Sequence, residues 1–120
     1  MPRRIALTPG EPSGIGPDLA IMLAQEARDY ELVAIADPDL LSRRAALLGL
    51  PLELQAIDLT QTPEADTANA GTLRYQPISL AQPEQAGILN PANASYVLQT
   101  LDEAVRGCAV GDYDALVTGP

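Results

Sequence analysis

The sequence predicts an α/β fold in which a mostly parallel sheet is flanked by helices. The first observation is that short apolar runs alternate with longer segments whose apolar residues recur at helical spacing. The second is that a proline stands at the first position of each helical segment, at Pro17, Pro38 and Pro91. Strands that alternate with helices are typical of parallel β-α-β connections, and the chain makes them without an internal sequence repeat.

The first half of the chain holds two predicted strands and two predicted helices. Residues 4–8 form a strand that we expect to be buried on both faces, because its apolar residues do not alternate with polar ones. A helix runs from Pro17 to about Arg28, and a second strand covers residues 32–36. Asp37 caps a second helix that Gly49 ends. Its apolar face is formed by leucines: Leu40, Leu41, Leu47 and Leu48.

The second half begins with a predicted strand over residues 52–57 and a polar surface loop over 58–71. Residues 72–77 read as a short edge strand, because Pro77 cannot donate to a ladder. Asn90 then caps a third helix, which Gly107 or Gly111 should end, and a last strand covers residues 114–118. Helical spacing predicts the apolar stripe of that third helix: Ala94, Val97, Leu98, Leu101, Val105 and Cys108.

The amino-acid composition limits the classes of function that this chain can have. The 120 residues fit one small domain or a piece of a larger protein, and a core without Phe or Trp must rest on Leu, Ile, Val and Ala. A formal net charge of −9 disfavours binding to nucleic acid or anionic lipid. No apolar run approaches the ~20 residues that span a bilayer. The single cysteine, Cys108, suits a reducing cytoplasm and reads as a small buried hydrophobe. The absence of histidine removes the usual general base and metal ligand.

The most informative segment is the turn between the first strand and the first helix, from Gly10 to Gly16. A glycine-rich turn that opens a helix can hold an anion or a nucleotide, because the first N–H groups of the helix lack partners. The turn completes no common phosphate motif: the Walker loop needs Lys, the dinucleotide fingerprint needs a glycine at Leu19, and the nucleophile elbow needs a residue between Ser13 and Gly14. A binding loop and a merely structural connection both remain open.

The same turn resembles a family signature. Residues 8–18, Thr-Pro-Gly-Glu-Pro-Ser-Gly-Ile-Gly-Pro-Asp, look like the amino-terminal signature of the 4-hydroxythreonine-4-phosphate dehydrogenases of vitamin B6 biosynthesis. Later segments agree in order over essentially the whole chain: Ala36-Asp37, 44–51, Ala70 to Leu73, Ala86-Gly87, Tyr96-Val97, Thr100-Leu101, Gly107-Cys108 and 115–120. The resemblance implies an isocitrate/isopropylmalate dehydrogenase-like fold, of which residues 1–120 are an amino-terminal fragment.

The resemblance also implies a reaction. NAD or NADP would oxidise the alcohol of 4-phosphonooxy-threonine, and the resulting β-keto acid would lose CO₂ to give an aminoketone phosphate for pyridoxal and pyridoxine 5′-phosphate biosynthesis. Family enzymes are homodimers that bind a divalent metal (Zn, Mg or Co) through histidines, and this sequence contains no histidine. No catalytic residue or metal ligand can therefore be named here, and we expect the 120 residues alone to be inactive. The expected partner is a small phosphorylated amino acid.

Two groups of site residues follow from the resemblance. The loop residues match the family signature and are assigned to the nicotinamide dinucleotide, with turn shaping as the alternative: Gly10, Glu11, Ser13, Gly14 and Gly16. Thr118 and Gly119 match the entrance to the family's active site and are expected to border the substrate. The chain stops directly after that strand, where a site loop would begin in an open α/β sheet, so we expect a piece of a longer protein. The remaining alternatives are another isopropylmalate-dehydrogenase-fold enzyme and a small non-catalytic α/β module.

Overall fold

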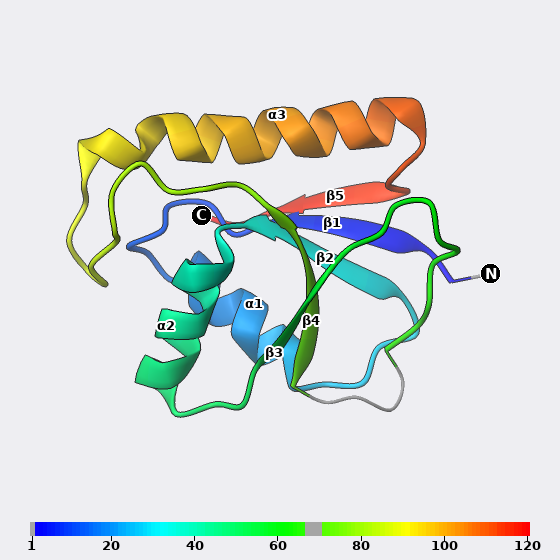
Figure 1. Ribbon diagram of the computed structural model, residues 1–120, viewed down its shortest axis with the longest axis horizontal. Helices are drawn as coiled ribbons and strands as arrows, with labels where there is room; N and C mark the ends of the chain where they lie inside the picture. Colours follow the sequence, from blue (N-terminus) through cyan, green and yellow to red (C-terminus); the bar gives the residue numbers. More distant parts are fainter. Residues whose placement is uncertain (1, 67–70) are drawn as a thin grey trace.

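The computed structural model describes residues 2–66 and 71–120, and within them all sheet pairings are parallel. Figure 1 shows the elements in chain order. The strands are β1 (Arg4–Thr8), β2 (Glu31–Ala36), β3 (Glu53–Ala56), β4 (Thr72–Pro77) and β5 (Ala115–Thr118). The helices are α1 (Gly16–Ala24), α2 (Pro38–Leu48), the 3₁₀ turn η1 (Pro91–Asn93) and α3 (Ala94–Val110). The predicted α/β class and parallel sheet are confirmed.

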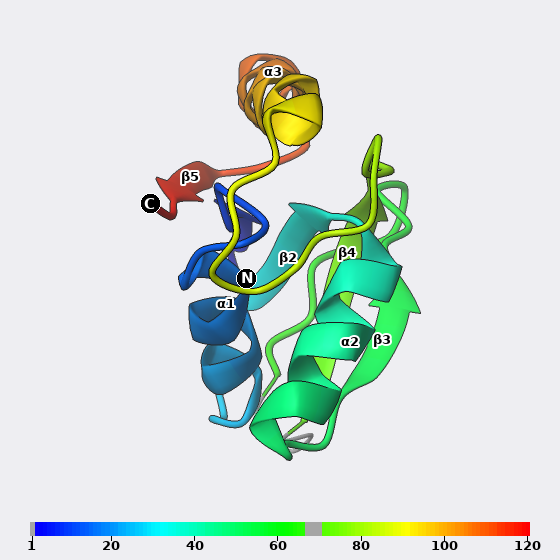
Figure 2. The same ribbon diagram turned by 90° about the vertical axis from the view of Figure 1, so that its left-hand side faces the viewer.

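The strands lie in the order β3-β4-β2-β1-β5, with helices on both faces. Figure 2 shows α1 and α2 together on one face and α3 alone on the other. The α1–α2 face of the core is built mostly from alanine and leucine. The α3 face gathers Ala6, Val33, Ile35, Ala104 and Tyr113. Small aliphatic residues therefore fill the centre, as the composition predicted, and the buried tyrosines Tyr96 and Tyr113 supply the larger volumes.

The predicted first helix is four residues too long, since α1 ends at Ala24. The cause is Arg28, whose side chain turns inward and is nearly fully buried. Its Nη1 donates to the carbonyls of Leu23 and Glu26, which close the end of the helix, and its Nη2 binds the Asp66 carboxylate at 2.9 Å. These contacts hold residues 25–30 in a tight connection to β2.

The predicted surface loop 58–71 is not wholly at the surface, because Asp66 is buried in its contact with Arg28. Residues 67–70 of that loop, including Ala70, lie outside the described part.

The prediction that residues 72–77 form an edge strand is wrong. β4 lies between β2 and β3, and it pairs with both. Ile78 donates its N–H to the carbonyl of Ala36, so the nitrogen of Pro77 faces the β3 side by alternation. There β3 has already ended, because its last partner pair is Ala56 with Tyr75. The missing donor of Pro77 therefore costs the sheet nothing, and β3 and β5 are the edges.

The predicted stripe of the third helix is also wrong. α3 packs on the sheet through Tyr96, Thr100, Ala104 and Gly107, whereas Leu98 and Val105 are exposed. Small residues let the helix approach closely: a Cβ added to Gly107 would lie 2.4 Å from Cδ2 of Tyr113. Cys108 is half-buried at the margin of the α3-side core. On α2, likewise, Leu40 and Leu41 are buried, but Leu47 is exposed and Arg44 is buried in its stead.

The two predicted Asx caps form. Asp37 accepts a hydrogen bond from the N–H of Asp39 at 2.9 Å and begins α2, and Gly49 ends it in the left-handed conformation. Asn90 accepts from the N–H of Ala92 at 3.0 Å, but it opens η1 instead of α3. Gly111, not Gly107, ends α3. Among the described residues, no helix is both long and apolar enough to cross a membrane.

Candidate functional site

The candidate site lies at the carboxyl end of the parallel sheet, where β1 and β5 finish side by side. Thr8 and Thr118 are partners in the ladder between these strands. The N–H of Gly119 donates to the carbonyl of Thr8 at 2.7 Å, and the N–H of Glu11 donates to the carbonyl of Pro120 at 3.1 Å. The turn after β1 and residues 118–120 therefore form one joined surface, and ligands of open α/β sheets bind at this edge. The structure thus brings together residues from the two predicted groups.

Three glycines allow the backbone to approach itself closely, Gly10 and Gly119 where the two segments join and Gly16 within the turn. Gly10 has a φ of +83°, and a Cβ there would lie 2.1 Å from the carbonyl oxygen of Pro120. A Cβ on Gly119 would lie 2.7 Å from the oxygen of Pro9, and a Cβ on Gly16 would lie 1.5 Å from the same oxygen. Since each glycine lets backbone approach backbone, their geometry supports the turn-shaping interpretation. Gly14 differs, because its Cβ would make only ordinary contacts, the nearest being 3.4 Å to the oxygen of Glu11.

The turn between Pro9 and Gly16 is fixed by its own side chains. The carboxylate of Glu11 accepts hydrogen bonds from the N–H of Ser13 at 3.1 Å and from its hydroxyl at 2.8 Å. The carbonyl of Glu11 accepts from the N–H of Gly14. The carboxylate of Asp18 stands in the first turn of α1, where the positive end of the helix dipole favours an anion. Carboxylates of this chain thus lie where a bound phosphate would compete with them.

Arg44 of α2 holds the turn from outside. Its guanidinium is buried and donates to the carbonyls of Pro12 and Gly14, each at 2.7 Å, and to the carboxylate of Asp18 at 2.6 Å. A planar guanidinium with five donors suits three acceptors at once. Sequence reasoning missed Arg44, because it occupies a core-facing position of α2 where the pattern favours leucine. A second loop also touches the turn, since the N–H of Gly87 donates to the carbonyl of Ser13 at 2.8 Å.

A cavity of about 500 Å³ opens at this edge, between the end of the sheet and the first half of α3. Thr8 lies in its wall and is 1% exposed, and its hydroxyl has no hydrogen-bond partner within the described residues. A buried hydroxyl without a partner costs free energy, so it is an unusual choice for a wall that is otherwise mostly apolar. Sequence reasoning missed Thr8 as a site residue, although it is the first residue of the quoted signature. The lining comprises Thr8, Gly10, Glu11, Val97, Thr100, Leu101, Thr118, Gly119 and Pro120.

Beside this cavity, the end of β2 is held by Asp37 and Tyr96. The hydroxyl of Tyr96 accepts from the N–H of Asp37 at 3.1 Å, and the carboxylate of Asp37 accepts from the N–H of Leu80 at 2.8 Å. Burial raises the pKa of Tyr96 to about 12, so its phenol is neutral at physiological pH. These hydrogen bonds stabilise the carboxyl end of β2, and each of the two side chains has its partner within the chain.

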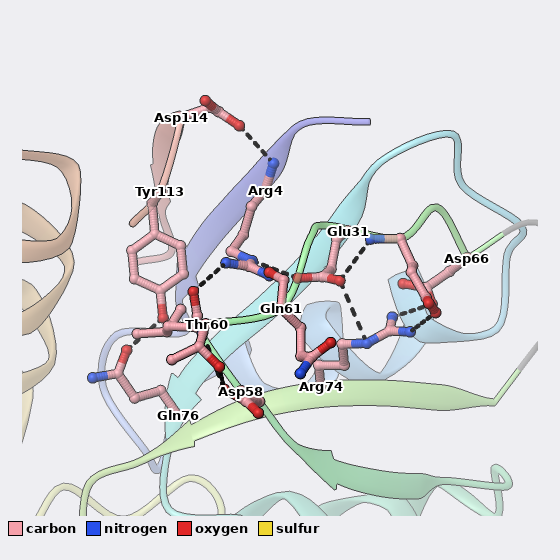
Figure 3. Close-up of polar contacts among 12 residues, drawn as sticks. Arg4, Glu31, Asp58, Thr60, Gln61, Asp66, Arg74, Gln76, Tyr113 and Asp114 are labelled. Carbon is pink, nitrogen blue, oxygen red and sulfur yellow. Dashed lines mark hydrogen bonds and ion pairs between the residues drawn. The ribbon is translucent and has the colours of Figure 1, made fainter. Parts of the chain in front are cut away.

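A second polar cluster lies at the opposite, amino-terminal end of the strands (Figure 3). We call it the buried ion cluster: Arg4, Arg28, Glu31, Asp66 and Arg74. Arg4 binds Glu31 at 2.5 Å, and Arg74 pairs with both Glu31 and Asp66. Arg4 also donates to the carbonyls of Leu59 and Gln61.

The pairings of the buried ion cluster join β1, β2 and β4 to the segment 58–66. Its three guanidiniums outnumber its two carboxylates, and the exposed carboxylate of Glu64, 3.7 Å from Arg74, supplies a third negative charge. Every carboxylate in it has a guanidinium partner, so the cluster holds no free base or nucleophile. We therefore assign it a structural role. Figure 3 also shows Tyr113, which donates its hydroxyl hydrogen to the side-chain oxygen of Gln76; burial raises the pKa of this tyrosine as well.

Known proteins resemble this chain in sequence. The sequence model of the family described as "Pyridoxal phosphate biosynthetic protein PdxA" matches residues 28–120. The chain belongs to this family. The 4-hydroxythreonine-4-phosphate dehydrogenase of Saccharophagus degradans is 52% identical over 119 residues, and that of Shewanella frigidimarina is 51% identical over 120 residues. These alignments cover 99% and 100% of the chain, so they include the signature turn that precedes the matched range.

Solved structures have a similar fold. A putative 4-hydroxythreonine-4-phosphate dehydrogenase from Salmonella typhimurium superposes with a TM-score of 0.82 at 27% identity, over 98% of this chain and 37% of that one. A terephthalate 1,2-cis-dihydrodiol dehydrogenase from Burkholderia xenovorans gives a TM-score of 0.71 at 21% identity, which shows a shared fold alone. The chain spans 35% and 36% of the length of the two curated PdxA relatives above.

The remaining predicted residues, Ser13 and Gly14, lie at the same carboxyl end of the sheet. Ser13 and Gly14 lie in the turn and contact Glu11, Gly87 and Arg44. Within residues 2–66 and 71–120, no three metal-ligating side chains gather in one place. The donor set here therefore does not fit a divalent metal.

Proposed function

We propose that this chain forms about a third of a dehydrogenase that oxidises 4-phosphonooxy-threonine with NAD or NADP. The observation that supports it is 52% identity, over 99% of this chain, to a relative named 4-hydroxythreonine-4-phosphate dehydrogenase. In the proposed reaction the substrate alcohol gives a hydride to the nicotinamide and a proton to a base, which leaves a ketone. The β-keto acid then releases CO₂ and takes up a proton, which yields an aminoketone phosphate.

The part of this chain in that reaction is to shape and border the cofactor cleft. We assign Gly10, Glu11, Ser13, Gly14 and Gly16 to the cofactor side, with the glycines acting mainly through the shape of the turn. We assign the unpartnered hydroxyl of Thr8 to the carboxamide of nicotinamide, since an amide offers both a donor and an acceptor. This pairing requires a small opening of the cavity wall, because Thr8 is 1% exposed in the chain alone. When bound, the nicotinamide supplies the hydride acceptor.

Thr118 and Gly119 border the substrate in this proposal. They follow directly from β5, and the hydrogen bond from Gly119 to Thr8 fixes them beside the wall of the cavity. The described residues do not fit a divalent metal, which would be held by histidines outside this sequence. A homodimer and a cytoplasmic location belong to the same proposal.

The test is a chimera in which this chain replaces the matching 119-residue segment of the Saccharophagus degradans relative. Reduction of NAD or NADP is followed by absorbance, with 4-phosphonooxy-threonine as substrate and a divalent metal present. We expect turnover by the chimera and none by the 120 residues alone. A folded chimera that binds cofactor but does not oxidise this substrate would contradict the proposal, and so would turnover by the isolated chain.

A further inference from the structure

One side of the molecule carries an uncovered apolar surface, which we call the β5 face. It has three adjoining parts: the free edge of β5, a groove over β1 and β5, and the outer side of α1. The groove has a volume of about 600 Å³, and its apolar lining comprises Ile5, Leu7, Leu23, Tyr30, Leu32, Ala115 and Val117. Figure 2 shows α1 and β5 on the same open side of the molecule.

The outer side of α1 continues this surface. Ile15, Leu19 and Met22 recur at helical spacing and are 61%, 44% and 53% exposed. Leu23 stands one turn after Leu19 and lines the groove, so the stripe and the groove meet. Val117 in the groove is 52% exposed. Parallel sheets are normally covered on both faces, and contiguous apolar patches of this kind mark interaction sites.

The two edges of the sheet differ in a way that points to a strand as partner. The edge strand β3 reads Glu-Leu-Gln-Ala, and its polar side chains discourage further pairing. The other edge, β5, reads Ala-Leu-Val-Thr and carries no charge within the strand. An uncharged apolar edge beside an uncovered groove is the arrangement expected of a strand that lies inside a larger sheet. The partner should therefore add a strand to β5 and place apolar side chains on the groove.

We infer that the β5 face binds the part of the PdxA fold that this chain does not span. The chain accounts for 35% to 37% of the relatives and solved structures described above, so a polypeptide of about twice its length is available to cover the face. The inference rests on family membership and on exposed apolar residues, and it does not depend on the proposed activity. A second copy of this chain is the competing occupant, because it offers the same free strand edge. It would bring no additional layer of strands and helices to cover the groove.

The experiment mixes this chain with the complementary part of the Saccharophagus degradans relative, which carries an affinity tag. The two are also co-expressed in case the partner is insoluble alone. We expect an equimolar complex by size-exclusion chromatography with light scattering. Two variants place a carboxylate on the face, Val117→Asp in the groove and Met22→Asp on the exposed stripe of α1. Each should weaken the complex by at least about thirtyfold, because an unpaired charge would be buried.

The control is Leu47→Asp on α2, where the side chain is 73% exposed and far in the fold from β5. It should leave the affinity unchanged. Circular dichroism melts establish that each variant is folded. Met22 lies outside the sheet and is 53% exposed, so Met22→Asp keeps the test valid if Val117→Asp unfolds. Absence of a complex would overturn the inference. So would a complex that tolerates both substitutions, or a dimer of this chain through the β5 face that excludes the partner.

Discussion

Replacing Gly16 by alanine tests whether the signature glycines shape the turn. An added Cβ at residue 16 would lie 1.5 Å from the carbonyl oxygen of Pro9, whereas real Cβ atoms stay at least 3.0 Å from such an atom. The two backbone segments must therefore separate by about 1.5 Å, and overpacking of this kind costs about 3 kcal/mol. Alanine recovers at most about 1 kcal/mol of helix propensity. We expect Gly16→Ala to lower the free energy of unfolding by about 2 kcal/mol.

Gly14→Ala is the matched control in the same turn. Its Cβ would meet the oxygen of Glu11 at 3.4 Å, an ordinary contact, so the stability should change by less than about 0.5 kcal/mol. The free energies of unfolding of both variants are measured by urea titration. Circular dichroism is the probe, since the chain has no tryptophan whose fluorescence could report unfolding. Equal stabilities for the two variants would refute the argument from backbone contact. In the chimera, a loss of dinucleotide affinity confined to Gly14→Ala would assign that glycine to the cofactor.

Three further predictions concern single side chains. Glu31→Gln should lower the free energy of unfolding in urea by about 3 kcal/mol, because it leaves Arg4 buried without its carboxylate. The same change at the more exposed Glu103 should lower it much less. Similar losses for the two variants would contradict a structural role for the buried ion cluster. Thr8→Val should raise the free energy of unfolding by about 1 kcal/mol, because it removes a buried hydroxyl without a partner, and it should weaken dinucleotide binding by the chimera. Unchanged binding would show that Thr8 does not contact the cofactor. Tyr96 has a pKa of about 12 in the folded chain against an ordinary 10, so unfolded chains lose the proton first and stability falls by about 2–3 kcal/mol between pH 10 and 12. Stability curves of Tyr96→Phe over this range should be flatter, and an identical slope would contradict the assignment.

The strands and caps could be predicted because their signals are local. The apolar run 4–8 and the Asp37 cap depend on adjacent residues, and both form where the sequence indicates. The position of β4 inside the sheet could not be predicted, since it depends on which neighbour Pro77 faces and where β3 ends. The buried face of α3 was mispredicted because the helix packs through the small residues Ala104 and Gly107, which carry little hydrophobic signal.

The candidate site was predictable in part for the same reason. The signature turn is contiguous, and the β5 ending could be paired with it because parallel strands share a carboxyl edge. The buried role of Arg44 required knowledge of how α2 lies against the turn, which no local pattern supplies. The empty hydrogen-bonding position of Thr8 is likewise visible only once α3 is placed over the sheet.

The contacts of Arg44 have a consequence for the time at which the signature turn becomes ordered. Its guanidinium bridges Pro12, Gly14 and Asp18 from a helix that follows in sequence, so the turn can reach its final shape only after α2 has docked. The entropy loss of ordering the turn is then incurred during folding and not when a ligand arrives. We expect the amide hydrogens of Ser13 and Gly14 to exchange slowly with solvent for residues in a loop, and replacement of Arg44 to accelerate that exchange.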